Sequence, residues 1–401
     1  MNNSPELDHL NVLVLDGGGV RGLSSLLILE DLIRRINENI RSKTGLMIDD
    51  LKPHQVFDLV VGTSTGGLIA IMIGKLGLSA KECINQYRNL SKEVFGRYHL
   101  RGKLSMGVFK PRYSGECLRD CVKRLLRTHD LPENFQMRSS KETSNQDSTT
   151  ACAVVCRRRD SRYSPLVKDA VFICSLKCLN SPNSLDCGVC DAARATSAAP
   201  TYFPPIKIGN RYFIDGAVEY NNPSFALFQH YRSSLPPDVK QNRRETHTSD
   251  LNFQRIRMVN LGTGNEPQRD EQMLAITSRS IVKRLRLFRS IRDAVVNGKD
   301  AIKIATTSQT QAEFMETLSQ ANESNGDIKY YRLSDNTGVC YIKLDDYKKL
   351  DDIQNSTLQY LNNHDTVDRL ERIANEITES HINKMVPNQP QSQIEKPRNE
   401  T

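Results

Sequence analysis

Apolar positions near the start of the chain form two blocks of the same design, each a short apolar run, a glycine-rich turn and a stretch with helical periodicity. The first block covers residues 11–40, with its turn at residues 16–22, and the second covers residues 56–76, with its turn at residues 62–67. In the first helix the apolar residues recur every three or four positions, and charged residues lie between them. Two strand-turn-helix units in succession favour a mostly parallel sheet that is covered by helices.

The remainder of the chain adds further strands and a mainly helical end. Gly209-Asn210 lies between short apolar runs, which predicts a β-hairpin over residues 207–214. Two polar stretches, residues 136–150 and 236–250, predict surface loops or insertions. By the same criteria we expect strands at residues 151–155, 170–174 and 257–261 and helices at residues 87–126, 191–197, 275–318, 345–362 and 367–379.

The composition excludes a chain that is disordered throughout or that spans a membrane. Hydrophobic residues make up 38% and charged residues 25% of the 401 positions, which is the balance of a globular chain. The longest apolar stretch, residues 68–78, contains Lys75 and is shorter than the ~20 residues of a membrane-spanning helix. The first residues lack the features of a secretory signal, so we expect a cytoplasmic protein. The net charge of +8 suits nucleic acid, an anionic membrane surface or solubility alone.

Ser64 lies in the second glycine-rich turn, within the pattern Gly62-Thr-Ser-Thr-Gly66. This pattern between a strand and a helix is typical of a nucleophile elbow, in which the serine occupies a strained turn. Side chains two residues before and after the serine would clash across the turn, which explains the two glycines. The N-terminus of the following helix favours developing negative charge. A phosphate-binding loop is disfavoured because Leu68-Ile69 stands where Lys-Ser/Thr is required.

The first glycine-rich turn, with Gly17, Gly18, Gly19 and Gly22, matches the Gly-x-Gly-x-x-Gly pattern of dinucleotide sites. Such a site needs an acidic residue at the end of a second strand ~20 residues later. Here that distance falls at residues 37–39, inside the expected helix. The same glycines permit an oxyanion hole, in which backbone N–H groups face a tetrahedral intermediate. A tight turn without a ligand is the third interpretation.

A serine nucleophile needs a neighbouring proton acceptor, and Asp215 is the aspartate that fits this role. It follows the apolar run 212–214 and precedes Gly216 and Ala217, although an Asp-Gly pair alone is an ordinary turn. The late histidines that would complete a serine triad fall in expected helices, in a polar insertion or near the tail. They are His230, His247, His364 and His381. A Ser-Asp dyad without histidine is therefore the simpler interpretation.

Taken together and in this order, the motifs resemble those of the patatin-like phospholipase family. They are Asp16-Gly-Gly-Gly-Val-Arg-Gly22, Gly62-Thr-Ser-Thr-Gly66 and Asp215-Gly-Ala217, with further similar segments at residues 193–203 and 260–264. The resemblance covers residues 10–261 most closely and points to the fungal and calcium-independent intracellular branch. It implies an α/β fold of three layers around a mostly parallel sheet. It also implies hydrolysis of acyl esters in phospholipids or neutral lipids, with no metal, no cofactor and no nucleic acid partner.

By position, the resemblance makes Ser64 the nucleophile and Asp215 the general base. It assigns the oxyanion hole to the backbone of residues 17–19, with Arg21 nearby. The other motif residues carried over are Gly22, Gly62, Gly66, Gly216 and Ala217. An aspartate with an unperturbed pKa of ~3.9 is a weak base for a serine hydroxyl, so its effect must come from positioning and from desolvation.

On this basis we divide the chain into four parts. They are an N-terminal extension (1–9), a catalytic domain (10–350) with a polar insertion at about 136–150 and a helical region at 275–318, C-terminal helices (351–386) and a disordered tail (387–401). Within the helical region, residues 283–292 are basic and amphipathic. Such a segment suits peripheral contact with an anionic membrane surface, and packing on the domain is the alternative.

Three cysteine pairs have short spacings that raise the question of a zinc site. They are Cys152-x3-Cys156, Cys174-x3-Cys178 and Cys187-x2-Cys190. Only the last pair has the usual spacing of zinc ligands, and three of the others fall in or near expected strands, where buried thiols are ordinary packing residues. We therefore expect reduced thiols and no metal.

Two functions from other classes stay open on the sequence alone. One is a nucleotide-binding oxidoreductase that uses the Gly17–Gly22 loop. The other is a non-catalytic interaction domain on the same fold, which is disfavoured because both Ser64 and Asp215 are present.

Overall fold

The computed structural model describes ten segments of the chain. They are residues 9–46, 48–96, 111–138, 150–161, 164–167, 170–175, 185–234, 255–265, 308–321 and 328–385. Several expectations from the sequence lie outside the described residues. These concern residues 1–8, most of the polar insertion (139–149), the loop at 236–250, the basic segment 283–292, the helical region up to residue 307 and the tail at 387–401.

Eight strands of the described chain form one sheet in the order β5-β6-β3-β2-β1-β7-β8, and β4 pairs with β3. Neighbouring strands in the series β3-β2-β1-β7-β8 run parallel. β4 and β6 each pair antiparallel with β3, and β5 pairs antiparallel with β6. The prediction of a mostly parallel sheet is confirmed. The strands are β1 (Leu10–Leu15), β2 (Leu59–Thr63), β3 (Ala151–Arg159), β4 (Val171–Cys174), β5 (Ile206–Ile208), β6 (Arg211–Asp215), β7 (Ile256–Leu261) and β8 (Ile328–Leu333).

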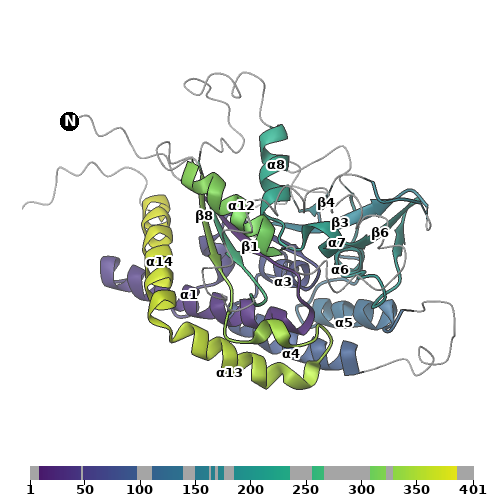
Figure 1. Cartoon of the computed structure of the whole chain (residues 1–401), viewed down its shortest axis with the longest axis horizontal. Helices are drawn as coiled ribbons and strands as arrows, with labels where there is room; N and C mark the ends of the chain where they lie inside the picture. The colour runs from purple at the N-terminus through teal and green to yellow at the C-terminus, as the bar shows by residue number, and fades with distance from the viewer. Residues whose placement is uncertain are drawn as a thin grey trace, which may run out of the picture.

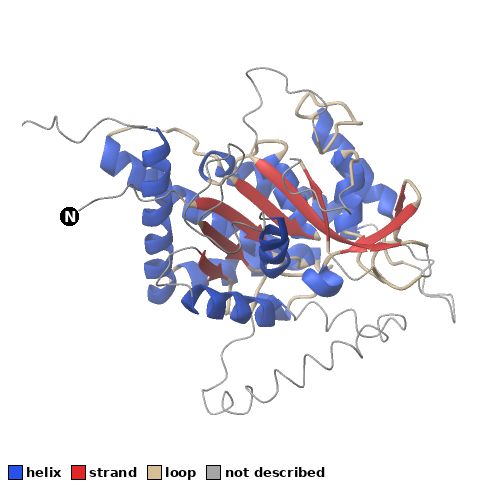
Figure 2. Cartoon of the chain, turned by 90° about the horizontal axis from the view of Figure 1, so that it is seen from above, coloured by secondary structure: helices blue, strands red, loops and turns tan. Residues whose placement is uncertain are grey.

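Helices cover both faces of the sheet, which gives three layers (Figures 1 and 2). Side chains alternate along a strand, so Leu13 and Leu15 of β1 pack toward α1, α3, α4 and α5, while Val12 and Val14 pack toward α8 and α12. The helices are α1 (Gly22–Thr44), α2 (Pro53–Val56), α3 (Thr65–Gly74), α4 (Ala80–Gly96), α5 (Gly115–Arg127), α6 (Val189–Thr196), α7 (Ala217–Tyr220), α8 (Ser224–Ser234), α12 (Ser308–Ala321), α13 (Leu350–Leu361) and α14 (His364–Met385).

Two predictions that bear on the site can be checked against the strands and helices. β5 and β6 form the predicted hairpin, with Ile208 opposite Arg211 across the Gly209-Asn210 turn. Residues 37–39 lie inside α1, as expected, so the position at which a dinucleotide site needs a strand end is helical. No helix in the described ranges is long and apolar enough to cross a bilayer.

The pattern of apolar residues predicts neither β8 nor the full lengths of α1 and α14. In β8, Lys329 and Arg332 interrupt the apolar pattern, and Arg332 is nevertheless buried because it pairs with Asp16. α1 continues to Thr44, where Gly45 adopts a left-handed conformation (φ 72°) and its N–H bonds to the carbonyl of Arg41. α14 begins at His364, earlier than predicted. The preceding residue, Asn363, caps the helix because its side chain accepts a hydrogen bond from Asp365 N.

Candidate active site

The motif residues meet because three parallel strands end at the same edge of the sheet. β1 lies between β2 and β7, with Leu15 level with Gly62 on one side and with Leu261 on the other. The glycine turn of residues 17–19 follows β1, and Ser64 follows β2. In α/β sheets this edge, at the carboxyl ends of parallel strands, is where ligands bind.

Asp215 reaches the same edge through an antiparallel strand. On β3, Val155 pairs with Thr63 of β2 and the next residue, Cys156, pairs with Asp215 of β6. Asp215 therefore lies just beyond the end of β2, next to Ser64, which directly precedes α3. The Ser64 hydroxyl donates a hydrogen bond to Asp215 Oδ2 at 2.6 Å.

The turn around Ser64 has the strained geometry that the glycine pattern predicts. Ser64 adopts φ 56° and ψ −125°, a region that L-residues rarely occupy. A Cβ on Gly62 would lie 2.1 Å from the carbonyl oxygen of Gly66, and one on Gly66 would lie 2.4 Å from that of Leu15. Thr196 stabilises the turn, because its Oγ1 accepts a hydrogen bond from Ser64 N at 2.9 Å. Side chains at either glycine would therefore displace the serine.

Within the described parts of the chain, Asp215 is a buried carboxylate without a cationic partner. Its exposed fraction is 1%. Burial raises the pKa of Asp215 to about 7, and the hydrogen bonds from the Ser64 hydroxyl and from Ala217 N oppose that rise. A carboxyl group with a pKa near 7 is a far better proton acceptor than an exposed aspartate.

The glycine turn lies against Ser64, and two of its three N–H groups already have acceptors. Gly17 N donates to the carbonyl of Asn221 at 3.0 Å, and Gly18 N donates to Thr65 Oγ1 at 3.2 Å. Within the described chain no acceptor is found for Gly19 N–H. Gly19 has φ 58°, and its carbonyl oxygen accepts a hydrogen bond from the Tyr87 hydroxyl.

Arg21 contacts the backbone of the glycine turn. Its Nε donates to the carbonyl of Gly18 at 3.3 Å, and its Nη1 donates to the carbonyl of Cys340 at 3.1 Å. Both bonds go to carbonyl oxygens, so the guanidinium ties the turn to the chain after β8.

Asp16, the first residue of the glycine motif, belongs to a buried polar network beneath the turn. Its carboxylate accepts bonds from Arg332 Nη1 at 2.9 Å and from Asn260 Nδ2 at 2.7 Å. Tyr330 and Asn222 donate in turn to Asn260 Oδ1. Asn222 lies in the chain segment that follows Asp215. This network therefore connects the glycine turn with the segment that follows Asp215.

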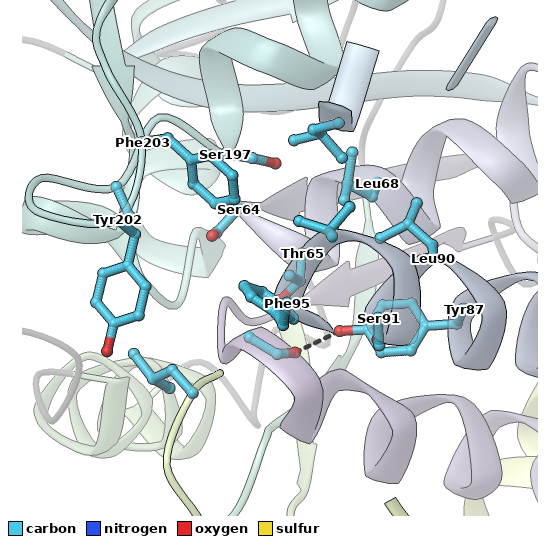
Figure 3. A pocket seen from close by; sticks show the side chains of 15 residues that line it. Ser64, Thr65, Leu68, Tyr87, Leu90, Ser91, Phe95, Ser197, Tyr202 and Phe203 are labelled. Carbon is cyan, nitrogen blue, oxygen red and sulfur yellow. Dashed lines mark hydrogen bonds between the residues drawn. The ribbon is translucent and has the colours of Figure 1, made fainter. Parts of the chain in front are cut away.

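A pocket with mainly apolar walls opens beside Ser64. Figure 3 shows Tyr202 and Phe203 on one side of Ser64, and Leu68, Leu90 and Tyr87 on the other. The far wall comes from α4 and α5, through residues such as Val94, Phe95 and Leu118. Gly19 also lines the pocket, so the glycine turn and Ser64 border the same cavity.

Several residues of the site carry no sequence signal of their own. Thr65 and Thr196 act through side-chain hydroxyls, Asn221 acts through its backbone carbonyl, and Arg332 lies 316 residues from its partner Asp16. Thr196 falls in the segment 193–203 that resembles the family, which is the only hint the sequence offers for it. The late histidines that the structure describes lie in helices. His230 belongs to α8 and stacks on Phe172, and His364 and His381 belong to α14. His247 lies outside the described residues.

The cysteines with metal-like spacings lie mainly in the core. Five of the six are buried and carry free thiols, and Cys178 lies outside the described residues. A different group, Glu93, Cys117 and Cys121, brings its ligand atoms within 4.8 Å of one another. Arg124 already occupies that group, since its Nη2 bonds to Glu93 and, at 3.2 Å, to Cys121 Sγ.

Comparison with known proteins gives one family and several relatives. The family model described as Patatin-like phospholipase matches residues 13–228. Patatin-like protein 1 of Arabidopsis thaliana is 29% identical over 290 residues, which cover 67% of this chain and 63% of the plant protein. Calcium-independent phospholipase A2-gamma of Homo sapiens is 27% identical over 57% of this chain and 27% of the human protein.

A bacterial relative is similar over a comparable length. The cGAMP-activated phospholipase of Vibrio cholerae is 30% identical over 277 residues, which cover 66% of this chain and 68% of the bacterial protein. The chain thus spans less than two thirds of the plant protein and about a quarter of the human one.

Proposed function

The chain belongs to the patatin-like phospholipase family, and from this premise we propose that it is a lipid acyl hydrolase. Its substrates are carboxylic esters of phospholipids or neutral lipids, and Ser64 and Asp215 form the catalytic dyad. The observation that carries the proposal is the bond of 2.6 Å from the Ser64 hydroxyl to a buried carboxylate whose pKa is about 7, at the mouth of an apolar pocket.

In the proposed reaction, Asp215 accepts the proton of Ser64 as the serine oxygen attacks the ester carbonyl. The alcohol leaves with that proton, and the acyl group stays on Ser64. Water then attacks the acyl-enzyme while Asp215 accepts a proton from it, and Asp215 returns this proton to the Ser64 oxygen as that oxygen leaves and the fatty acid is released. The strained backbone of Ser64 holds its oxygen at the mouth of the pocket throughout.

Gly19 N–H is the proposed oxyanion donor of the glycine turn. Among residues 17–19 it is the N–H group without an acceptor in the described chain, since those of Gly17 and Gly18 already donate. The N-terminus of α3, directly after Ser64, adds a favourable field for the same negative charge. Arg21 stabilises the turn, because its guanidinium donates a hydrogen bond to the carbonyl of Gly18.

The apolar pocket is the proposed site of the acyl chain. Leu68, Leu90 and Phe95 offer the contacts that a hydrocarbon chain makes, and they begin next to Ser64. The rival dinucleotide site is less favoured, because α1 occupies the position of the required strand end. A non-catalytic role does not explain why a carboxyl group with a raised pKa lies next to Ser64.

The finer assignments belong to the same proposal. The calcium-independent type is supported by the similarity to the human calcium-independent phospholipase A2-gamma and by the position of Asp215 as the base. An intracellular site is favoured by the free thiols of the described cysteines. Peripheral contact with an anionic membrane follows from a substrate that resides in an interface and from the net charge of +8.

Release of fatty acid from phospholipid vesicles tests the proposal. Vesicles of phosphatidylcholine with an anionic phospholipid are incubated with the wild-type chain in EDTA, beside Ser64→Ala and the exposed control Ser42→Ala. We expect steady release by the wild type and Ser42→Ala, and a loss of ~10⁴-fold or more in Ser64→Ala, because the nucleophile is gone. Equal release by Ser64→Ala, or none by the folded wild type on phospholipid and monoacylglycerol alike, contradicts the proposal.

A further inference from the structure

A short segment after β8 lies directly on the glycine turn. This segment, residues 339–345, is called the strap, and it falls beyond the residues 13–228 that the family model matches. Val20 N donates to the carbonyl of Leu344 at 2.8 Å, and Arg21 Nη1 donates to the carbonyl of Cys340 at 3.1 Å. A Cβ on Gly19 would lie 2.0 Å from the Leu344 carbonyl oxygen. The strap thus fixes both residues that follow Gly19.

The same segment continues to the opposite wall of the pocket. Leu344 lines the pocket together with Gly19 and Ser64. The next residue, Asp345, accepts a hydrogen bond from the Tyr113 hydroxyl at 2.9 Å, and Arg112 Nη1 lies 3.4 Å from the same carboxylate oxygen. One carboxylate therefore anchors the end of the strap.

Tyr113 is a firm anchor for Asp345. Its backbone N–H bonds to the carbonyl of Tyr202 at 2.8 Å, and its ring packs edge-on against Phe95 with centroids 5.2 Å apart. Burial, and then the hydrogen bond to Asp345, raises the pKa of Tyr113, so its hydroxyl keeps the proton that it donates. The Asp345 side chain is only 15% exposed, which shields the contact from water.

We propose that the strap positions the oxyanion turn, and that Asp345, through its bond to Tyr113, is the positioning residue that sets it. Asp345 acts on the reacting atoms through the Leu344 carbonyl, Val20 and Gly19. This inference rests on the proposed function, since it gives the strap a part in the same reaction. The oxyanion develops only as the serine attacks and is absent from the bound substrate, so loss of the anchor lowers kcat and leaves KM nearly unchanged.

The test uses a short soluble ester, p-nitrophenyl acetate, whose acyl group is too small to depend on the pocket wall. We expect Asp345→Ala and Tyr113→Phe each to lower kcat by about 10-fold with KM within about 2-fold. The double variant falls no further than Asp345→Ala alone, because both changes remove the same bond between Tyr113 and Asp345. Asp345→Asn, whose amide oxygen still accepts from Tyr113, restores kcat to within about 3-fold of the wild type.

Asp351→Ala is the matched control, since Asp351 is an exposed aspartate at the start of α13 that pairs with Arg88, and we expect it to keep the wild-type kcat. Should Asp345→Ala fail to fold, Tyr113→Phe removes only a hydroxyl and carries the same comparison. Unchanged kcat in Tyr113→Phe, or a rise in KM alone, overturns the strap proposal while the hydrolase proposal stands. Absence of any turnover above Ser64→Ala in the wild type overturns both.

Discussion

Two buried aspartates lie at strand ends in this site, and their surroundings differ. Asp16 directly follows β1, and Asp215 is the last residue of β6. Each of the two residues is 1% exposed. Asp16 faces the guanidinium of Arg332 at 2.9 Å and the amide of Asn260. Among the described residues, Asp215 faces only the neutral donors of Ser64 and Ala217.

The difference separates a carboxylate that holds the fold from one that is available for chemistry. Burial raises the pKa of both, but at Asp16 the positive charge of Arg332 opposes the rise. At Asp215 the opposing groups are uncharged, and the pKa reaches about 7. A buried carboxylate without a cation is costly for folding, and such a cost is expected at a working active site.

Asp215→Asn should give the largest effect that separates the two residues. We expect kcat on lipid esters to fall by ~10²- to 10⁴-fold, because the general base is lost. The pKa of Asp215 is about 7 in the folded state, whereas its ordinary pKa of 3.8 applies in the unfolded state, so the wild type loses stability as the pH rises from about 4 to about 7. Asparagine escapes this loss, and the variant should be more stable by at least about 1 kcal/mol at pH 8. Urea unfolding at pH 4 and pH 8 checks this, and a less stable variant at pH 8 would count against an uncompensated Asp215.

The same substitution at Asp16 should do the reverse. Asp16→Asn leaves the buried Arg332 without its partner, and we expect a loss of about 3–5 kcal/mol in the free energy of unfolding. Arg332→Met should cost a similar amount, and the double variant should lose clearly less than the sum of the two, because no unpaired charge remains. Urea denaturation of the three variants measures this, and additive losses would show that the pair is not coupled.

The sequence predicts the parts of this site that depend on local pattern. The two glycine turns, Ser64 and the strand before Asp215 follow from apolar runs and turn residues, and the order of the motifs predicts that they meet. The geometry is consistent with that expectation, since the Ser64 hydroxyl donates a hydrogen bond to Asp215.

Other parts depend on contacts that no local pattern records. Arg332 interrupts the apolar pattern of β8, and its burial makes sense only beside Asp16, which is distant in sequence. The strap holds the glycine turn through the carbonyls of Cys340 and Leu344, and every residue type has a carbonyl. The family resemblance gives Arg21 a place near the oxyanion hole, and no local pattern records that its guanidinium donates to the carbonyls of Gly18 and Cys340.

The pH dependence of kcat/KM tests most directly whether Asp215 is the uncompensated base of this site. On a soluble ester, the wild type should lose activity about tenfold per pH unit below about pH 7, because the protonated carboxyl cannot accept the proton of Ser64. The residual activity of Asp215→Asn should show no such fall, and circular dichroism at each pH confirms that both proteins stay folded. A wild-type profile that is flat from pH 8 down to pH 5, or a fall that persists unchanged in Asp215→Asn, would contradict the account.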